Sequence, residues 1–471
     1  MGTTGAIEAQ ELSVAMTEVL AEQLRGHFAK ARARQEDLCF ASWLPSRGTR
    51  RLTAVLQRLI LPAGHERLLH GNASFTSEYV QRVLGEVTPG QGVAFLHSHL
   101  GPGWQGMSTD DEGAERDRLA SAIAGRTGLP LVGLTWGTDG SFSARAWGRT
   151  GRLEYGRRWA ETVRVVGRRL QLTFHPDLRP PPVASSAQVA TVSVWGEAHQ
   201  RDLARVRVGI VGLGSVGSIV AEGLSRIGVS HFTFIDPDCV EWRNLDRTAG
   251  ARREDARLRR PKVQVAERTV RSASTATQLE VNAHELSLLT PKGMDLALDC
   301  DVLFSCVDRP WPRHVLNAIA YAHLIPVVDG GILARVRDGR LLHVDWRIHT
   351  VGPGRPCLEC IGAILPEEIQ VDMTGGFDNP DYIAGLPQEL LDVVSGRNVY
   401  AFSLSVGAHE ILQFVGLVSG DDRVGGRGPQ MYHAYPGEMR VDSESRCRAE
   451  CDYSKLTGTA ADLSGNLTPI R

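Results

Sequence analysis

Two histidines one residue apart, His97 and His99, end the apolar run GVAFLHSH, and a carboxylate, Asp111, follows after a loop. The run predicts a strand, whose period-2 alternation places both imidazoles on one face. Two imidazoles and one carboxylate can hold zinc while a fourth position stays open to water, as in catalytic zinc sites. Asp111 stands just inside an expected helix that Ser108 could cap, and Asp110 is a competing ligand. The spacing alone is equally compatible with two structural histidines.

A glycine-rich loop in RVGIVGLGSVGSIV connects an expected strand to an expected helix. Gly212, Gly214 and Gly217 form Gly-x-Gly-x-x-Gly, which allows a tight turn and a close approach of the backbone to phosphate at a helix N-terminus. Asp236 ends the next expected strand, where its carboxylate can accept hydrogen bonds from ribose hydroxyls. By itself this pattern also fits an NAD-dependent dehydrogenase.

Several polar residues follow the glycine loop in a definite order. The segment FIDPDCVEWRNLDR leads to RRPKVQVAERTV, and DVLFSCVDRP comes later. This order resembles the ThiF/MoeB family and the adenylation domains of ubiquitin-activating enzymes. The resemblance implies nucleotide-binding or catalytic roles for Asp236, Asn244, Arg247, Lys262 and Asp308, with Asp308 on magnesium.

The implied reaction is adenylation of a carboxylate by ATP with release of pyrophosphate, which needs cations and magnesium near the phosphates. A dehydrogenase has no use for such a set on these loops. Lys262 is one of only four lysines among 52 basic residues. The resemblance implies a ubiquitin-like or sulfur-carrier protein as the partner and a homodimer through this domain. Family members usually have Gln where Thr248 stands.

The histidine pair resembles the JAMM (JAB/MPN) metallopeptidase motif, in which His-x-His is followed by Ser-x-x-Asp. That family has a glutamate upstream on an early strand, and Glu36 stands well upstream in EDLCFASW. The resemblance implies that His97, His99 and Asp111 hold zinc, that Glu36 is the general base and that Ser108 stabilises the oxyanion. Between His99 and Ser108 there is one residue more than in the best-known members. The implied reaction is (iso)peptide cleavage after the C-terminus of a ubiquitin-like protein, and a JAMM-like fold without activity is the alternative.

Four of the eight cysteines form two close pairs, namely Cys357 with Cys360 and Cys447 with Cys451. Four thiolates suit a closed structural zinc site, which the ThiF/MoeB family also has at this place, and a redox pair is the alternative. Activating relatives carry a thioester-forming cysteine after the first pair, but no cysteine occurs between residues 361 and 446. Met373 and Thr374 stand where a Cys-Thr would be expected. A thioester intermediate is therefore in doubt, with Cys239 as a remote candidate.

The elements that must position these groups follow from apolar periodicity. Helices are expected over residues 7–34 and 108–125. Strands are expected over residues 38–43, 53–61, 92–97, 131–135 and 141–147. From residue 206 onward, strands and helices alternate, which predicts parallel β-α-β units.

The sequence therefore predicts an α/β protein with two different domains. Residues 1–170 are expected to form a JAMM-type α/β domain with a central mixed sheet. Residues 191–455 are expected to form a Rossmann-like ThiF/MoeB domain with a mainly parallel sheet. A proline-rich linker is expected over residues 171–190, and a polar tail over residues 456–471.

The composition is that of a globular protein, with 42% hydrophobic and 23% charged residues and a formal net charge of −2 over 471 residues. This charge argues against bulk nucleic-acid binding and against a polybasic membrane anchor. We find no apolar run of about 18 residues and no secretory pattern, so no membrane partner and a cytoplasmic location are expected. The combined hypothesis is processing and activation of a ubiquitin-like or sulfur-carrier protein. The alternatives are similar chemistry on a peptide or small-molecule carboxylate, and a non-catalytic scaffold with degenerate sites.

Overall fold

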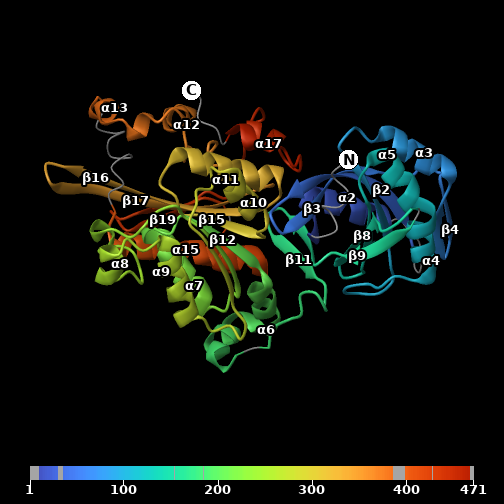
Figure 1. Ribbon diagram of the computed structural model, residues 1–471, viewed down its shortest axis with the longest axis horizontal. Helices are drawn as coiled ribbons and strands as arrows, with labels where there is room; N and C mark the ends of the chain where they lie inside the picture. Colours follow the sequence, from blue (N-terminus) through green and yellow to red (C-terminus); the bar gives the residue numbers. More distant parts are fainter. Residues whose placement is uncertain are drawn as a thin grey trace. The chain divides into compact units, whose positions relative to one another are not determined.

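The computed structural model describes residues 10–29, 35–152, 154–183, 185–385, 398–426 and 428–466. The chain divides into two compact units, whose helices and strands are labelled in Figure 1. Unit 1 comprises residues 1–180 and 458–460, and unit 2 comprises residues 181–457 and 461–471. Each unit has its own large sheet covered by helices, so the α/β class predicted from the sequence is confirmed.

Unit 1 is built on a nine-stranded mixed sheet with the strand order β11-β10-β1-β3-β2-β6-β7-β8-β9. Strand β1 runs parallel to β10 and β3, and β6 runs parallel to β7, whereas the other neighbours are antiparallel. The strands are β1 Glu11–Thr17, β2 Leu38–Arg47, β3 Arg51–Ile60, β6 Gly92–Ser98, β7 Leu131–Trp136, β8 Phe142–Arg149, β9 Tyr155–Trp159, β10 Thr162–Val166 and β11 Leu170–Phe174. A separate hairpin consists of β4 Arg67–His70 and β5 Asn72–Phe75.

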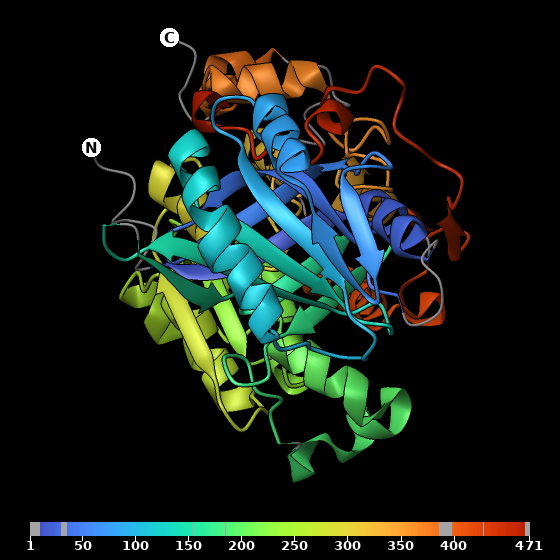
Figure 2. The same ribbon diagram turned by 90° about the vertical axis from the view of Figure 1, so that its right-hand side faces the viewer.

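Helices of unit 1 lie across its sheet (Figure 2), namely α2 Glu18–Phe28, α3 Ser77–Glu86, α4 Thr109–Glu112, the π-helical segment η1 Gly113–Leu119, and α5 Ala120–Thr127. Alternate residues of β2 enter two different apolar clusters. Cys39 and Ala41 pack in the cluster that contains α2 side chains, whereas Leu38 and Phe40 pack in the cluster that contains α3 and α5 side chains. The central strands are therefore buried on both faces.

The helix expected over residues 7–34 is wrong in its first half. Residues Glu11–Thr17 form β1, and α2 begins only at Glu18 after Thr17, whose hydroxyl accepts a hydrogen bond from Leu20 N at 3.2 Å. Strand β1 lies between β3 and β10 and is buried on both faces, so its apolar residues follow one another without a clear period of two. Such a run cannot be distinguished from a buried helix by periodicity.

Two of the expected boundary segments also contain ordered elements. Strand β11, Leu170–Phe174, occupies the first residues of the expected linker and pairs with β10. In the expected polar tail, Leu463 is buried in an apolar cluster of unit 2, with 5% of its surface exposed. The proline content of the first segment and the low apolar content of the second concealed these contacts.

Unit 2 is built on an eight-stranded sheet with the order β14-β13-β12-β15-β16-β17-β18-β19. The first five strands in this order are parallel, and the rest are added antiparallel. The strands are β12 Arg207–Val211, β13 His231–Ile235, β14 Glu280–His284, β15 Val302–Ser305, β16 Val327–Arg337, β17 Arg340–Val351, β18 Gln430–His433 and β19 Glu438–Val441. The Rossmann-like arrangement predicted for this half is confirmed.

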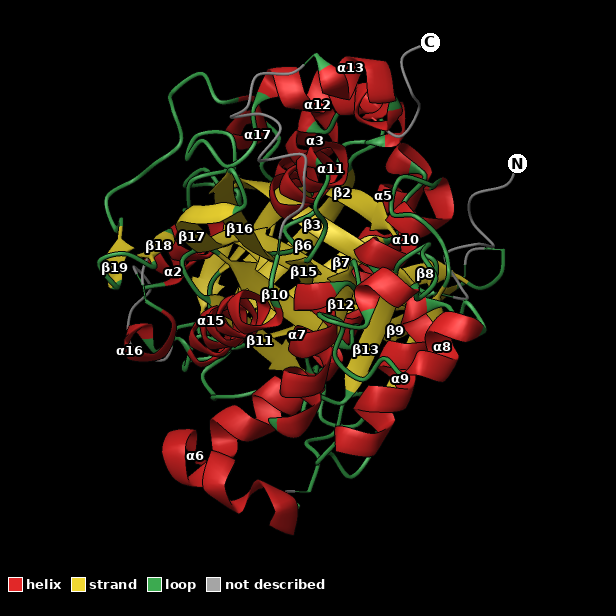
Figure 3. Ribbon diagram, turned by 90° about the vertical axis from the view of Figure 1, so that its left-hand side faces the viewer, coloured by secondary structure: helices red, strands yellow, loops and turns green. Residues whose placement is uncertain are grey.

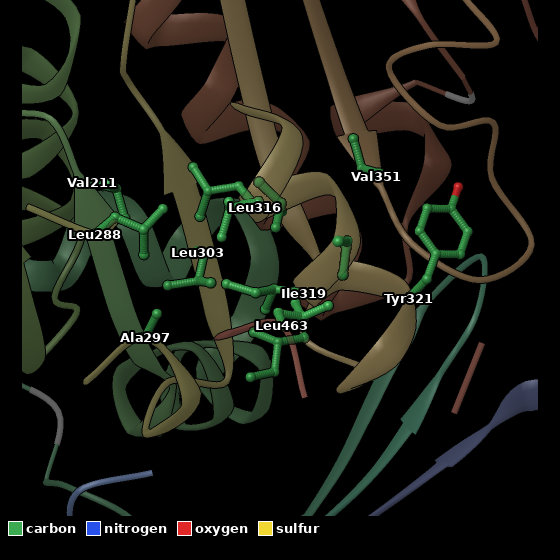
Figure 4. Packing of buried hydrophobic residues seen from close by; sticks show 14 of the residues in the cluster. Val211, Leu288, Ala297, Leu303, Leu316, Ile319, Tyr321, Val351 and Leu463 are labelled. Atoms are coloured by element: carbon green, nitrogen blue, oxygen red, sulfur yellow. The ribbon is translucent and has the colours of Figure 1, made fainter. Parts of the chain in front are cut away.

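The parallel strands of unit 2 are connected by helices (Figure 3), and Figure 4 shows Leu303, Leu316 and Ile319 packed in its apolar core. The helices are α6 Val189–Arg205, α7 Ser215–Arg226, α8 Arg253–Arg257, α9 Lys262–Ala273, α10 Pro291–Leu298, α11 Pro310–Ala322, α12 Pro366–Met373, α13 Pro380–Ala384, α15 Tyr400–Ser419, α16 Asp422–Gly425 and α17 Asp452–Lys455.

Among the described residues, α15 is the one helix that is long and apolar enough to cross a membrane, with a mean hydropathy of 1.4. It packs against α7, β16 and β17, and Val406 and Phe414 on it are fully buried. These contacts are those of a core helix, and apolar composition on most sides of a helix follows from such burial.

Candidate functional site

The side chains of His97, His99 and Asp111 meet in unit 1, and we refer to them as the N-terminal triad. His97 lies on β6, His99 follows it, and Asp111 lies in α4. His97 Nε2 lies 3.2 Å from His99 Nε2, and each of these atoms lies 3.3 Å from one oxygen of Asp111. Zinc bonds of about 2.0–2.1 Å place tetrahedral ligand atoms about 3.3 Å apart, so the donor set has the spacing that zinc requires.

The capping interaction at α4 fixes the orientation of the triad carboxylate. Ser108 Oγ accepts a hydrogen bond from Asp111 N at 3.1 Å, and Asp111 Oδ2 accepts one from Ser108 N at 2.8 Å. Asp110, one residue earlier, is exposed and is not among the grouped donor atoms. The sequence left these two aspartates as competing ligands, and the structure places Asp111 with the histidines.

Glu36 lies two residues before β2, near enough to the N-terminal triad for the charges of His99 and Asp111 to affect its pKa. Its backbone N–H donates to Gly71 O at 3.0 Å, and its side chain is half-buried. Burial raises the pKa of Glu36, the charge of His99 lowers it, and the charge of Asp111 raises it further. A carboxylate whose pKa is raised beside a metal-ligand set suits a general base.

A buried ion pair is connected to His97 through Thr135, and the sequence did not indicate it. Thr135 Oγ1 lies 3.3 Å from His97 Nε2 and accepts a hydrogen bond from Arg145 Nη1 at 2.5 Å. Arg145 is paired with Glu115, and both side chains are fully buried. A Cβ on Gly133 would lie 2.4 Å from a Glu115 oxygen, so only glycine leaves room for this pair.

The glycine loop of unit 2 follows β12 and leads into α7. Gly212 has a φ of +87°, and a Cβ there would lie 2.5 Å from Cys306 O. A Cβ on Gly217 would lie 1.9 Å from Gly212 O, whereas nothing lies within 4 Å of one built on Gly214, the N-cap of α7. The first and third glycines are therefore needed for packing, and the second leaves open space at the helix N-terminus, where a phosphate can bind.

Asp236 and Lys262 lie at the same end of the sheet as the glycine loop. Asp236 is buried and accepts hydrogen bonds from Leu213 N at 2.5 Å and Asp238 N at 2.8 Å. Burial raises the pKa of Asp236, while the Lys262 charge lowers it. Lys262, the first residue of α9, donates from Nζ to Asp238 Oδ2 at 2.7 Å. Asp238 is a partner that the sequence analysis missed, and it holds the lysine near the loop.

The other predicted nucleotide residues lie on the loops after β13 and β15. Asn244 Oδ1 accepts a hydrogen bond from Glu241 N at 2.9 Å and closes the turn Trp242–Asn244. Arg247 Nη1 donates to Asp246 Oδ1 and to Arg243 O, both at 2.9 Å. Asp308 is exposed just after β15, which is the neighbour of β12 in the sheet. The carboxyl ends of adjacent parallel strands thus present these loops together, as ligand sites of open α/β sheets do.

The four cysteines of the two pairs form a second donor cluster in unit 2, and their sulfur atoms all lie within 4.8 Å of one another. Cys357 Sγ lies 3.6 Å from Cys451 Sγ. Backbone N–H groups donate to three of the sulfurs, from Cys357 to Cys447, from Cys360 to Cys357 and from Arg448 to Cys360. Such bonds stabilise thiolates, and four thiolates suit a closed zinc site.

The remaining cysteines and the residues at the missing thioester position lie elsewhere. Cys39 and Cys300 are buried in apolar cores. Cys239 Sγ lies 4.0 Å from Glu285 Oε1. Met373 and Thr374 lie at the C-terminal end of α12, and the Thr374 hydroxyl donates to Gln370 O at 3.0 Å.

The ThiF family model matches residues 185–387. The sulfur carrier protein ThiS adenylyltransferase of Bacillus subtilis (strain 168) is 29% identical over 172 residues, which are 36% of this chain and 48% of that protein. The molybdopterin-synthase adenylyltransferase of Escherichia coli (strain K12) is 28% identical over 183 residues, or 38% of this chain and 68% of that protein.

A solved structure of Escherichia coli MccB with ATP matches with a TM-score of 0.41 and 16% identity, over 54% of this chain and 68% of that chain. The chain spans about half of the length of the Bacillus subtilis relative described above. The family match and the curated relatives support a ThiF/MoeB-like domain in the second half of the chain.

Proposed function

We propose that unit 2 adenylates the C-terminal carboxylate of a ubiquitin-like or sulfur-carrier protein. The observation that carries this proposal is the glycine loop with Asp236 and Lys262 at one end of a parallel sheet, within the segment that matches the ThiF family. Two curated relatives are named as adenylyltransferases, one for the sulfur carrier protein ThiS and one for molybdopterin synthase.

The residues of unit 2 provide the groups that this reaction needs. The backbone at Gly214 and the N-terminus of α7 can accept the phosphates, and Lys262 and Arg247 bring positive charge to them. Asp236 can accept hydrogen bonds from the ribose. Asp308 is the candidate ligand for magnesium, which when bound would neutralise charge on the pyrophosphate leaving group. The substrate carboxylate then attacks the α-phosphate, and an acyl-adenylate and pyrophosphate form.

We further propose that unit 1 is a zinc peptidase that acts at the same C-terminus. The N-terminal triad would hold zinc, which when bound would act as a Lewis acid. Glu36 would take a proton from the attacking water and deliver it to the leaving amine. Ser108 Oγ accepts a hydrogen bond from Asp111 N, and in the proposed reaction its O–H group would donate to the oxyanion.

A common substrate links the two proposals. Cleavage after the C-terminal glycine of a precursor or conjugate exposes the carboxylate that adenylation consumes. The four-cysteine site would hold a structural zinc. Within residues 361–385 and 398–446 the structure contains no sulfur nucleophile, so the proposed product is an acyl-adenylate. A homodimer formed through unit 2, a cytoplasmic location and the absence of nucleic-acid and membrane partners stay predictions.

ATP–pyrophosphate exchange tests the adenylation proposal. A carrier protein ending in Gly-Gly should stimulate exchange, whereas free small acids should not. Lys262→Ala and Asp308→Asn should each abolish exchange, and Lys292→Ala, an exposed lysine on α10, is the matched control. Exchange with small acids alone would instead identify a small-molecule adenylating enzyme, and no exchange with either class would support a scaffold.

A further inference from the structure

A second group of two histidines and one aspartate lies on the antiparallel edge of the unit 2 sheet. His343 and Asp345 are two residues apart on β17, so their side chains point to the same face. His433 on β18 is directly opposite Asp345 in the register, which places it on that face as well. We refer to these three residues as the hairpin triad.

The side chains of the hairpin triad are in direct contact. His343 Nε2 lies 2.5 Å from Asp345 Oδ2, and His433 Nδ1 lies 2.9 Å from Asp345 Oδ1. One ligand atom from each residue lies within 4.8 Å of the other two. The side chains of His343, Asp345 and His433 are 37%, 17% and 25% exposed, so an ion from solvent can reach them.

We propose that the hairpin triad binds a divalent transition metal ion of the zinc class. Two imidazoles and one carboxylate are the donor set that zinc, cobalt and nickel accept, with positions left for water or another ligand. The two imidazole nitrogens face one carboxylate, and in the described part of the chain no arginine or lysine is paired with that carboxylate. A metal ion would replace the two hydrogen-bonded protons, and the closest ligand atoms need to separate by about 1 Å to reach zinc geometry.

The neighbouring strand carries a carboxylate that could become a fourth ligand if its side chain moved toward the hairpin triad. Glu438 on β19 is opposite His433 in the register and therefore lies on the same face. Its carboxylate lies 3.3 Å from Arg440 Nε in an exposed pair, which is weak enough to be exchanged for a metal. A metal at this place would connect β17 to the β18–β19 hairpin. The chain then continues to Cys447, so the hairpin triad and the four-cysteine site would both fix this segment to unit 2.

This proposal does not depend on either proposed activity. The test uses the full chain stripped of metal by a chelator and titrated with Co²⁺, followed by metal analysis. The double variant His343→Ala/His433→Ala should bind one Co²⁺ fewer per chain than the parent, and so should Asp345→Asn, which keeps the shape of the side chain. His70→Ala, an exposed histidine in unit 1, is the matched control and should bind as the parent does. Equal stoichiometry in the parent and both hairpin variants would show a hydrogen-bonded array only, and overturn the proposal.

The absorption spectrum of bound Co²⁺ separates the sites. Thiolate-to-cobalt charge transfer belongs to the four-cysteine site and should be unchanged in the hairpin variants, whereas the bands of cobalt with nitrogen and oxygen ligands should weaken. Hydrogen exchange then tests the connection between strands. Zinc should slow exchange of the β18 amides in the parent protein and not in Asp345→Asn. Loss of metal together with unchanged β18 exchange would refute the role of the metal in fixing the hairpin.

Discussion

The N-terminal triad and the hairpin triad contain the same donor groups, two imidazoles and one carboxylate, but differ in the distances between these groups. In the N-terminal triad all three separations are 3.2–3.3 Å, and both histidines face the carboxylate and each other. In the hairpin triad the carboxylate lies between the histidines and contacts each at 2.5–2.9 Å. The distances in the N-terminal triad are those between ligand atoms around a zinc ion. The distances in the hairpin triad are those of hydrogen bonds between the histidines and the carboxylate.

The surroundings explain this difference. Asp111 is fixed by the helix cap at Ser108, and Thr135, which contacts His97 Nε2, is held by the buried Arg145–Glu115 pair. The hairpin triad lies on partly exposed strands, and its side chains are hydrogen-bonded to one another. A preorganised donor set costs little reorganisation when a metal binds, which is what catalysis requires. The comparison therefore favours the proposed catalytic role for the first triad and the proposed structural role for the second.

The largest expected effect is on the rate of cleavage, which should depend on the N-terminal triad and not on the hairpin triad. Glu36→Gln should lower cleavage of a carrier fusion by about 10²–10⁴-fold, because it removes the proton acceptor beside the N-terminal triad. Glu22→Gln, an exposed glutamate on α2, is the matched control. Asp345→Asn should leave cleavage unchanged. The cleavage rate is measured by mass spectrometry of the product. An equal loss of cleavage in Glu36→Gln and Asp345→Asn would show that the two triads do not differ in function.

Adenylation should be unaffected by Glu36→Gln, just as Lys262→Ala should leave cleavage intact. The residues proposed for the two reactions belong to different units. If either variant removed both activities, the two sites could not be independent.

The buried support of the N-terminal triad predicts a large effect on stability. Glu115→Gln leaves the Arg145 charge buried without its partner, which costs about 3–5 kcal/mol. Glu112→Gln, which breaks the exposed pair with Arg157, should cost about 0–1 kcal/mol. Hydrogen exchange of the β7 and β8 amides is the appropriate measurement, because a chain of two units does not unfold in one step. Similar costs for both variants would contradict the supporting role of the ion pair.

The sequence predicted the donor cluster of unit 1 better than it predicted the helices and strands there. Spacing in the motif was enough to bring His97, His99 and Asp111 together, because a strand and a capped helix have fixed periodicities. The helix expected at its N-terminus was wrong where β1 is buried on both faces. The Thr135–Arg145–Glu115 network depends on three elements distant in sequence, so no local pattern could indicate it.

In unit 2 the order of motifs predicted both the parallel sheet and the loops at its end. The hairpin triad was missed because His433 is far from His343 in sequence and meets Asp345 only through strand pairing. The pairing of Lys262 with Asp238 was missed for a different reason. Asp238 was adjacent to the predicted Asp236, but nothing in the pattern gave the direction of its side chain.

A histidine outside both triads predicts how unit 2 responds to acid. His323 is buried, and burial lowers its pKa from 6.5 to about 4. The unfolded chain therefore binds a proton between these pH values that the folded chain does not, so stability is complete above about pH 6.5 and falls toward pH 4. The loss is up to about 3 kcal/mol for this group. His323→Gln should reduce the pH dependence measured by hydrogen exchange of β15 and β16 at pH 7 and pH 5, and an unchanged dependence would show that other groups dominate.

The smallest expected effect is the change in stability when the hairpin triad is altered in the absence of metal. Comparing this change with the change in the presence of zinc tests whether the hairpin triad binds metal. Asp345→Asn keeps the size of the side chain and one acceptor, and the contacts are partly exposed, so the cost should be about 1 kcal/mol or less. With zinc at about 100 times its dissociation constant, the parent should gain about 2.7 kcal/mol in the stability of the β17–β18 pairing, because zinc binds only the folded strands. Asp345→Asn should gain nothing from this site. Since the four-cysteine site is intact in both proteins, its contribution cancels in the difference. A gain of equal size in both proteins would place all the zinc stabilisation at the cysteines and leave the hairpin triad as a hydrogen-bonded array.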